Sequence, residues 1–337
     1  MSEAPHTLDF LALGDIVTDN FIKLTNESIA ERFSKEHKKL CFNFGDKVPY
    51  ESTTDLRAVG NSPNAAVSAT RLGLNSGLVT DVGDDTNGHE CVATLKRNGV
   101  DDSFVTVHEG EETNYHFVLW YEAERTILVK HQEYDYKLPD IGSPKWLYLS
   151  SLAENSYPYH EKIADYLDEH PEIHLSFQPG TFQMILGKDK LKRLYERSQL
   201  FFCNREEAKR ILEIPESEKH EMIDLLQKMH ELGPDIAVIT DGPEGSYAYD
   251  GKNAWWQPMY PDPKPPVDRT GAGDAFSSTF TAALGLGNDI PTALQWGPIN
   301  SMSVVQYVGA QRGLLSREQL LEHLANAPED YKPKKIA

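Results

Sequence analysis

The sequence predicts an α/β protein, a three-layer α/β/α sandwich in which helices cover both faces of a mostly parallel sheet. Short apolar segments typical of buried strands alternate along the chain with segments that have helical spacing. Strands without polar alternation are typical of a parallel sheet that is buried on both faces. With 39% hydrophobic and 25% charged residues, the chain has a globular composition, and we expect one domain over 1–337 with a small added element.

The individual elements follow from local patterns. Predicted buried strands cover 8–13, 76–82, 146–149, 173–177, 200–203 and 236–240. A helix over 64–72 ends before Gly73, and a helix over 221–232 ends before Gly233, because glycine favours the conformation that follows a helix. These boundaries give the alternation of strands and helices that a parallel sheet requires.

Two stretches depart from this alternation, and the first, 20–57, has no strong period. Residues 113–121 alternate in polarity and aromatic content, turn at 122–125 and return over 126–131, which predicts a β-hairpin with apolar side chains on both faces. From the pattern alone, packing on the edge of the core is the first expectation for this hairpin. A lid over a ligand and a dimer surface are the alternatives.

Charge and cysteine content argue against several classes of function. A net charge of −19, without a basic run, argues against nucleic acid as a partner. The 3 cysteines are widely separated, so neither a disulfide framework nor a thiolate metal site is expected. The first residues do not resemble a signal peptide, and no stretch approaches the roughly 18 apolar residues of a spanning helix. We therefore expect a cytoplasmic protein without a membrane partner.

The segment 267–276 carries the most chemical information. Gly271, Ala272 and Gly273 form a turn of small residues before a helix with an apolar face. Unpaired N–H groups at a helix start attract anions, so this turn can hold a phosphoryl group in transfer. Asp274, at the same helix start, is placed to accept a proton from an attacking hydroxyl. The alternative is a tight turn in which Asp274 only caps the helix.

Several motifs together resemble one family. The run Asp-Arg-Thr-Gly-Ala-Gly-Asp-Ala-Phe over 268–276 resembles the C-terminal signature of the PfkB, or ribokinase-like, kinases. The segment from Gly60-Asn61-Ser62-Pro63-Asn64 to Gly88 resembles their N-terminal signature, and similarity extends over about 8–325. The resemblance implies a ribokinase-like fold with a lid formed by about 17–57 and 105–131. It also implies an ATP-dependent kinase that uses Asp274 as general base and the 271–274 turn as anion hole.

The resemblance implies which residues contact the acceptor. Asp19 matches a carboxylate that binds acceptor hydroxyls, and Gly60, Asn61 and Asn64 match a second set of contacts. Asn64 is also a candidate N-cap of the following helix. The family commonly has two glycines where this chain has Val59 and Gly60, so we expect the local turn to differ.

The resemblance also implies the sites for ATP, Mg²⁺ and a monovalent cation. Asn204 and Glu207 match an element that organises Mg²⁺ through water, although both also fit a helix capping box. The remaining candidates are Thr240, Gly242 and Gly245 for the ATP phosphates, Asn300 beside the adenine, and Asp268 with the 309–313 loop for potassium.

The acceptor is the open question. A small sugar is the first expectation, and a nucleoside of the adenosine type is the alternative, with an apolar shelf drawn from Phe21, Phe42, Phe44, His116 and Trp120. A phosphorylated sugar would require a nearby cation, for which Arg125 and Lys130 are candidates. The remote alternative is a sugar or nucleotide sensor without catalytic activity. A homodimer through the lid is a further expectation.

Overall fold

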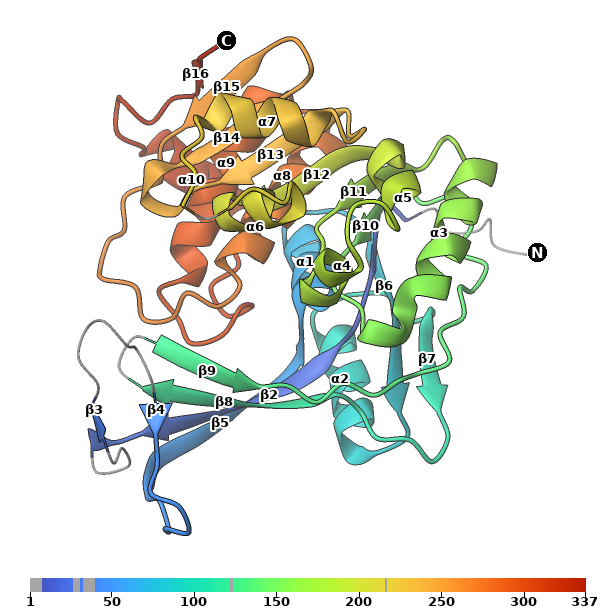
Figure 1. The fold of residues 1–337 in the computed structure, drawn as a ribbon, viewed down its shortest axis with the longest axis vertical. Helices are drawn as coiled ribbons and strands as arrows, with labels where there is room; N and C mark the ends of the chain where they lie inside the picture. Colours follow the sequence, from blue (N-terminus) through green and yellow to red (C-terminus); the bar gives the residue numbers. More distant parts are fainter. Residues whose placement is uncertain (1–7, 27–30, 33–39, 122–123, 216) are drawn as a thin grey trace.

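A large twisted sheet forms the centre of the molecule (Figure 1). The computed structural model describes residues 8–26, 31–32, 40–121, 124–215 and 217–337. Within these residues, one sheet of 10 strands has the order β16-β15-β14-β13-β12-β11-β10-β1-β6-β7. From β7 to β13 all neighbours are parallel, and β14 to β16 are antiparallel. The strands are β7 (Val105–His108), β6 (Ser76–Gly83), β1 (Phe10–Leu13), β10 (Trp146–Leu149), β11 (His174–Phe177), β12 (Ser198–Asn204), β13 (Ile236–Thr240), β14 (Ser246–Tyr249), β15 (Ala254–Gln257) and β16 (Lys334–Lys335).

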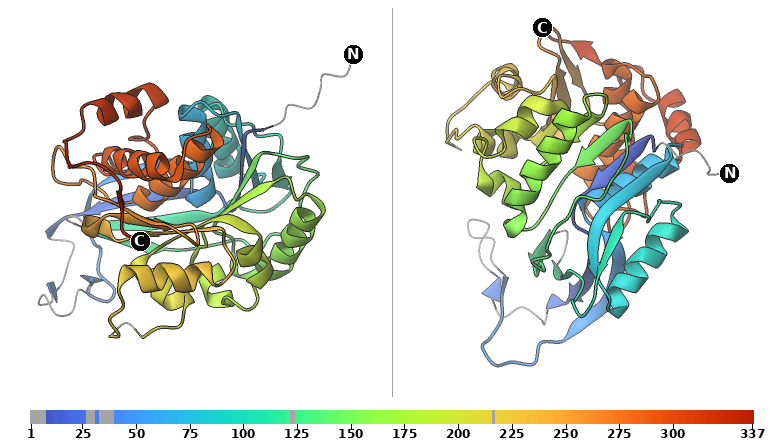
Figure 2. Two further views of the ribbon diagram at one scale, coloured as in Figure 1. Left: turned by 90° about the horizontal axis from the view of Figure 1, so that it is seen from above. Right: turned by 90° about the vertical axis from the view of Figure 1, so that its right-hand side faces the viewer.

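Helices cover both faces of this sheet (Figure 2). Along β1, Phe10 and Ala12 pack into one apolar core, while Leu11 and Leu13 pack into the other, because successive side chains of a strand point to opposite faces. The first core is covered by α1 (Asn61–Arg71), α2 (Thr86–Arg97), α8 (Ala272–Gly285), α9 (Ile290–Val304) and α10 (Arg317–Ala325). The second is covered by α3 (Tyr157–Glu169), α4 (Thr181–Leu186), α5 (Lys192–Arg197), α6 (Arg205–Ile211) and α7 (Met222–His230). The predicted three-layer sandwich is confirmed.

A second, smaller sheet projects from one end of the sandwich (Figure 1). Its order is β5-β2-β8-β9, and it consists of β5 (Tyr50–Val59), β2 (Val17–Leu24), β8 (Tyr115–Tyr121) and β9 (Glu124–Leu128). A separate short pair joins β3 (Glu31–Arg32) to β4 (Leu40–Cys41). The predicted hairpin is confirmed as β8 and β9, in which Val118 is buried and Phe117 is 45% exposed. We call the four-stranded sheet the lid.

Two boundaries predicted from the sequence are wrong. The lid was expected to include residues from about 105, but β7 pairs in parallel with β6 and belongs to the main sheet, where it provides hydrogen-bond partners for the edge of β6. The first predicted helix begins at Asn61 instead of residue 64, with Gly60 as its N-cap at a φ of 120°. Asn64 is therefore inside the helix and does not cap it. Part of the expected lid segment, 27–30 and 33–39, lies outside the described residues.

The sequence predicted that no segment forms a membrane-spanning helix. Within the part of the chain that the structure describes, no helix combines the length and apolarity needed to span a bilayer.

Candidate active site

The predicted Gly-Ala-Gly turn opens α8. Gly271 is its N-cap, with a φ of 77° that favours glycine, and a Cβ at this position would lie 2.2 Å from the Cβ of Ala310. At Gly273 an added Cβ would lie 3.9 Å from Nε2 of Gln178, and no other side chain among the described residues comes within 4 Å of it apart from its chain neighbours. Gly271 thus allows Ala310 to pack closely against the turn, whereas Gly273 leaves open space beside the backbone at the helix start.

A cavity of about 410 Å³ lies between the lid and the carboxyl ends of the main strands. Such a position, outside the ends of parallel strands, is where α/β proteins usually bind ligands. The predicted site residues that line it are Asp19, Gly60, Asn61, Asn64, Asn204, Glu207, Thr240, Gly271, Gly273 and Asp274. The fold therefore gathers residues from five separate stretches of the chain into one cavity.

A second cavity of about 290 Å³ adjoins the first. It is lined by Thr240, Gly242, Gly245, Ala272 and mostly apolar side chains, and it shares Thr240, Arg269, Gly273 and Phe276 with the first cavity. The two cavities therefore meet at the start of α8. A molecule in one cavity can therefore approach a molecule in the other beside this turn.

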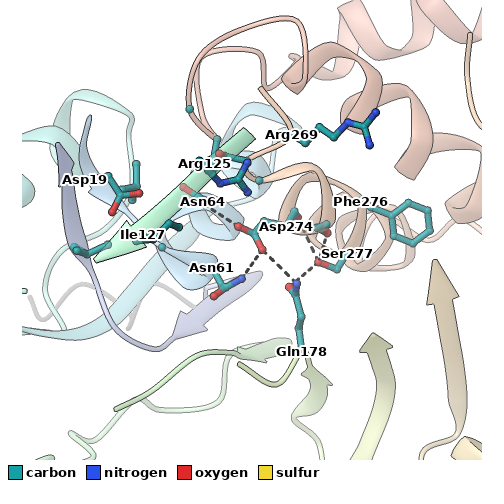
Figure 3. Close-up of a pocket in the computed structure, with 18 of the residues that line it drawn as sticks. Asp19, Asn61, Asn64, Arg125, Ile127, Gln178, Arg269, Asp274, Phe276 and Ser277 are labelled. Carbon is teal, nitrogen blue, oxygen red and sulfur yellow. Dashed lines mark hydrogen bonds between the residues drawn. The ribbon is translucent and has the colours of Figure 1, made fainter. Parts of the chain in front are cut away.

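Asp274 lines the first cavity, where three side-chain amides surround its carboxylate (Figure 3). Its side chain is buried, with the residue 8% exposed. The amide nitrogen of Asn61 donates to Oδ1 at 2.6 Å, and that of Asn64 donates to Oδ2 at 2.9 Å. Both residues were expected to bind the acceptor, whereas here they bind the carboxylate that was predicted to be the base.

Sequence reasoning missed Gln178, which donates from Nε2 to Oδ1 of Asp274 at 3.2 Å. This residue directly follows the buried strand β11, so its position at the carboxyl end of a parallel strand was a usable signal. Arg269, which lines both cavities, was also missed, although it lies within the signature.

Asp19 lies at the lid end of the first cavity (Figure 3). One of its oxygens is 3.2 Å from Nδ1 of His116 on β8, and both side chains are 12% exposed. This oxygen, Oδ1, and Nε2 of His116 are buried and have no hydrogen-bond partner among the described residues, so both are available to hydroxyls of a ligand.

Arg125, on β9, connects the lid to the signature loop. Its Nη1 is 3.1 Å from Oδ1 of Asp268, which is 7% exposed. The same oxygen accepts from the backbone and the hydroxyl of Thr270, and Oδ2 accepts from the backbone of Gly309 at 2.9 Å. The charge of Asp268 is thus balanced by an arginine at the position where a monovalent cation was expected.

Only some of the expected acceptor-binding side chains reach the cavity. Phe21, His116 and Arg125 line it. The cavity is not lined by Phe42, Phe44, Trp120 or Lys130. Lys130 is exposed and forms an ion pair with Glu112. Phe42 and Phe44 are exposed on the segment that joins β4 to β5.

Asn204 and Glu207 form the predicted capping box of α6. Asn204 accepts from the backbone of Glu207 at 2.8 Å, and Glu207 Oε2 accepts from the backbone of Asn204 at 2.9 Å. Burial raises the pKa of Glu207, and the bond from Asn204 acts against that rise. Both residues also line the first cavity, so capping and contact with a ligand are compatible.

Asn300 is a correction. It has no exposed surface and lines neither cavity, because its amide bonds the hydroxyl of Thr279 at 2.7 Å and accepts from the backbone of Leu315 at 2.9 Å. Its place within α9 argues against contact with an adenine ring. Ser301 and Met302 of the same helix line the second cavity instead.

The expected departure near Val59 also has a different form. Val59 has an ordinary φ, whereas its neighbour Ala58 has a φ of 56°, so the turn is made by Ala58 and Gly60.

Two cavities that meet at a helix start, with a buried carboxylate lining one of them, are typical of an enzyme that transfers a group between two small molecules. Residues 27–317 match the model of the pfkB family carbohydrate kinases. The chain therefore belongs to this family and is an ATP-dependent kinase.

Individual relatives differ in what they phosphorylate. The chain is 27% identical over 288 residues to the 5-dehydro-2-deoxygluconokinase of Halalkalibacterium halodurans, covering 80% of this chain and 86% of the relative. It is 26% identical over 259 residues to a nucleoside kinase of Methanothermobacter thermautotrophicus, covering 76% of this chain and 80% of the relative. In fold it resembles the Arabidopsis thaliana ribokinase complexed with ribose and ATP, with a TM-score of 0.76, 19% identity, and coverage of 94% and 99%.

Proposed function

We propose that this kinase transfers the γ-phosphoryl group of ATP to a hydroxyl of a small sugar. The observation that carries the proposal is the position of Asp274, a buried carboxylate that lines the first cavity next to Gly273, which lines both cavities. An acceptor hydroxyl in the first cavity would lie beside this carboxylate and face the second cavity.

The transfer proceeds in line and without a covalent phospho-enzyme. Asp19 accepts hydrogen bonds from acceptor hydroxyls at the lid end, and Asp274 takes the proton of the attacking hydroxyl. The bond from the acceptor oxygen to the γ-phosphorus forms while the bond from the γ-phosphorus to the bridging oxygen of ADP breaks. Backbone N–H groups of the 271–274 turn, at the positive end of α8, stabilise the charge on the transferred group.

ATP fits the second cavity. After β13 it is lined by Thr240, Gly242 and Gly245, which would face the phosphates. Its apolar wall suits the adenine ring of ATP. Among the described residues there is no cluster of three or more acidic, histidine or cysteine side chains that could hold a metal. Glu207 and Asn204 instead suit Mg²⁺ that arrives with phosphate and water ligands, whose role is to neutralise phosphate charge. A potassium ion at Asp268 stays a prediction, since Arg125 already balances this carboxylate.

A nucleoside is the second candidate acceptor. The lid end of the first cavity has an apolar wall that a sugar alone does not require. This wall consists of Val17, Phe21, Leu56 and Ile127. The relationship to a nucleoside kinase at 26% identity supports the same alternative. A sensor without catalytic activity is disfavoured, because the carboxylate and the small-residue turn are both in place.

The test is an ATP-consumption screen over sugars, sugar phosphates and nucleosides with purified wild-type enzyme. We expect one class to be phosphorylated and the Asp274→Asn variant to be inactive toward it. Turnover that is independent of Asp274 would refute the proposed mechanism, and turnover of nucleosides alone would replace the sugar as acceptor. Dimerisation through the lid and a cytoplasmic location stay predictions.

A further inference from the structure

Three side-chain amides converge on the carboxylate of Asp274. Asn61 and Gln178 both donate to Oδ1, at 2.6 and 3.2 Å, and Asn64 donates to Oδ2 at 2.9 Å (Figure 3). An ionised carboxylate offers about two acceptor positions on each oxygen. Both positions of Oδ1 are therefore filled, whereas Oδ2 keeps one.

Two hydroxyls lie behind Gln178 and can bond either orientation of its amide, so the carboxylate of Asp274 determines the orientation. Tyr148 bonds Oε1 of Gln178, and Ser277 Oγ lies 2.8 Å from the same atom. The opposite orientation of the amide would place Oε1 against Oδ1 of Asp274, so that two acceptors would face each other. The amide nitrogen must therefore point to the carboxylate.

Both hydroxyls can donate to Oε1 in this orientation. Tyr148 is fully buried, and burial raises the pKa of its phenol, which keeps it a neutral hydroxyl. Ser277 lies on α8 one turn after Asp274, 1% exposed and 2.7 Å from the Tyr148 hydroxyl. The set links β10, β11 and α8, three elements that are far apart in the chain.

The amide of Asn64 is oriented in a similar way on the other side. Its Oδ1 accepts from Nε2 of Gln311 at 3.0 Å, and the same nitrogen is 2.6 Å from the carbonyl of Ala58. Because a carbonyl can only accept, the Gln311 amide must present its nitrogen, and Asn64 must present its own nitrogen to Asp274.

We propose that Gln178 is a positioning residue for the base: with Asn61 it occupies Oδ1, so that Oδ2 alone receives the proton of the acceptor hydroxyl. This inference rests on the proposed role of Asp274 as general base. The proton moves from the acceptor oxygen to Oδ2, and the electron pair left on that oxygen forms the bond to the γ-phosphorus. Gln178 touches neither proton nor phosphorus, and acts by stabilising the ionised carboxylate in one orientation.

A purely structural role for Gln178 makes a different prediction. If it only joined β11 to α8, its loss would lower stability without altering the kinetics of the enzyme that remains folded. If it positions the base, its loss would lower kcat and move the acidic limb of the pH–kcat profile to higher pH, because a donor to the ionised form is lost. Binding of ATP and acceptor would hardly change.

The experiment uses the full-length enzyme with the acceptor found in the screen. Gln178→Met keeps the size of the side chain and removes the donor. Ser277→Ala removes one hydroxyl that contacts the amide of Gln178 and leaves the amide itself in place. Ser278→Ala is the matched control, since this neighbouring hydroxyl is equally buried but bonds only helix carbonyls, 2.6 Å from that of Asp274. For each variant we would measure the pH profiles of kcat and of both KM values, together with unfolding in urea.

We expect Gln178→Met to lower kcat about 10- to 100-fold near neutral pH and to move the acidic limb to higher pH, with KM changed less than about threefold. Ser277→Ala should give the same signature more weakly, and it should add nothing to Gln178→Met, because both act through one amide. Ser278→Ala should leave the profile unchanged.

Three results would overturn the inference. They are an unmoved pH profile in Gln178→Met, a rise of KM in place of the fall of kcat, or equal effects of Ser277→Ala and Ser278→Ala. If Gln178→Met does not fold, Ser277→Ala against Ser278→Ala decides alone. A wild-type activity that survives Asp274→Asn would instead refute the base itself, so the two failures are distinguishable.

Discussion

Replacement of Asp274 by asparagine separates the chemistry of this carboxylate from its contribution to the fold. The amide keeps the shape but cannot take the proton, so we expect kcat to fall by about 10²- to 10⁴-fold, equivalent to about 3–5 kcal/mol on the barrier. Whichever way the new amide turns, its nitrogen faces either the donor from Asn64 or the donors from Asn61 and Gln178. One buried donor left without an acceptor costs about 1–3 kcal/mol of the free energy of unfolding, so the variant should still fold.

The assay measures the turnover of one acceptor with ATP, the binding of ATP by calorimetry and unfolding in urea, all on the same preparation. ATP affinity should stay within about threefold, because the carboxylate lines the acceptor cavity and not the second one. Asp85→Asn is the control, since this carboxylate also accepts three hydrogen bonds at a helix start, from Gly88 and Thr113, but lines neither cavity. It should lose stability and keep its kcat. Near-wild-type turnover of Asp274→Asn would remove this residue from the role of base.

Three further predictions concern the metal, the lid and pH. Glu207→Gln should raise the Mg²⁺ concentration for half-maximal rate about tenfold or more with little loss of stability, because glutamine also fits the capping box; an unchanged Mg²⁺ dependence would leave capping as its only role. Backbone amides over Tyr115–Trp120 should exchange with deuterium more slowly once the true acceptor is bound, whereas ATP alone should protect mainly 240–245 and 271–274; equal protection would mean that the hairpin does not respond to the acceptor. Burial lowers the pKa of His160 from 6.5 to about 4, so the unfolded chain binds a proton in this range that the folded chain does not. The free energy of unfolding should therefore fall as the pH drops from 6.5 to 4, by up to about 3 kcal/mol, and His160→Gln should flatten the slope; an equal slope in the variant would assign it to other groups.

Local patterns were sufficient for most of the architecture. Continuous apolar runs predicted the buried strands, because a strand covered on both faces has no solvent-exposed side to mark with polar residues. The alternation over 113–121 predicted the hairpin, and the small residues before Asp274 predicted a helix start. The lid boundary near 105 failed, because a short strand such as β7 joins whichever sheet offers a free edge, and that choice depends on contacts remote in the chain.

The sequence by itself determined the order of strands and helices, the glycine-rich helix start and the chemical types available for catalysis, since these follow from residue type and spacing along the chain. Only the tertiary structure decided which side chains meet. It placed Gln178 from β11 and two asparagines from α1 on Asp274, put Arg125 of the lid on Asp268, and withdrew Asn300 into the core. The physical reason is that an amide or a guanidinium finds its partner through the packing of whole elements against each other, and spacing in the sequence carries no record of the distances across a folded sheet.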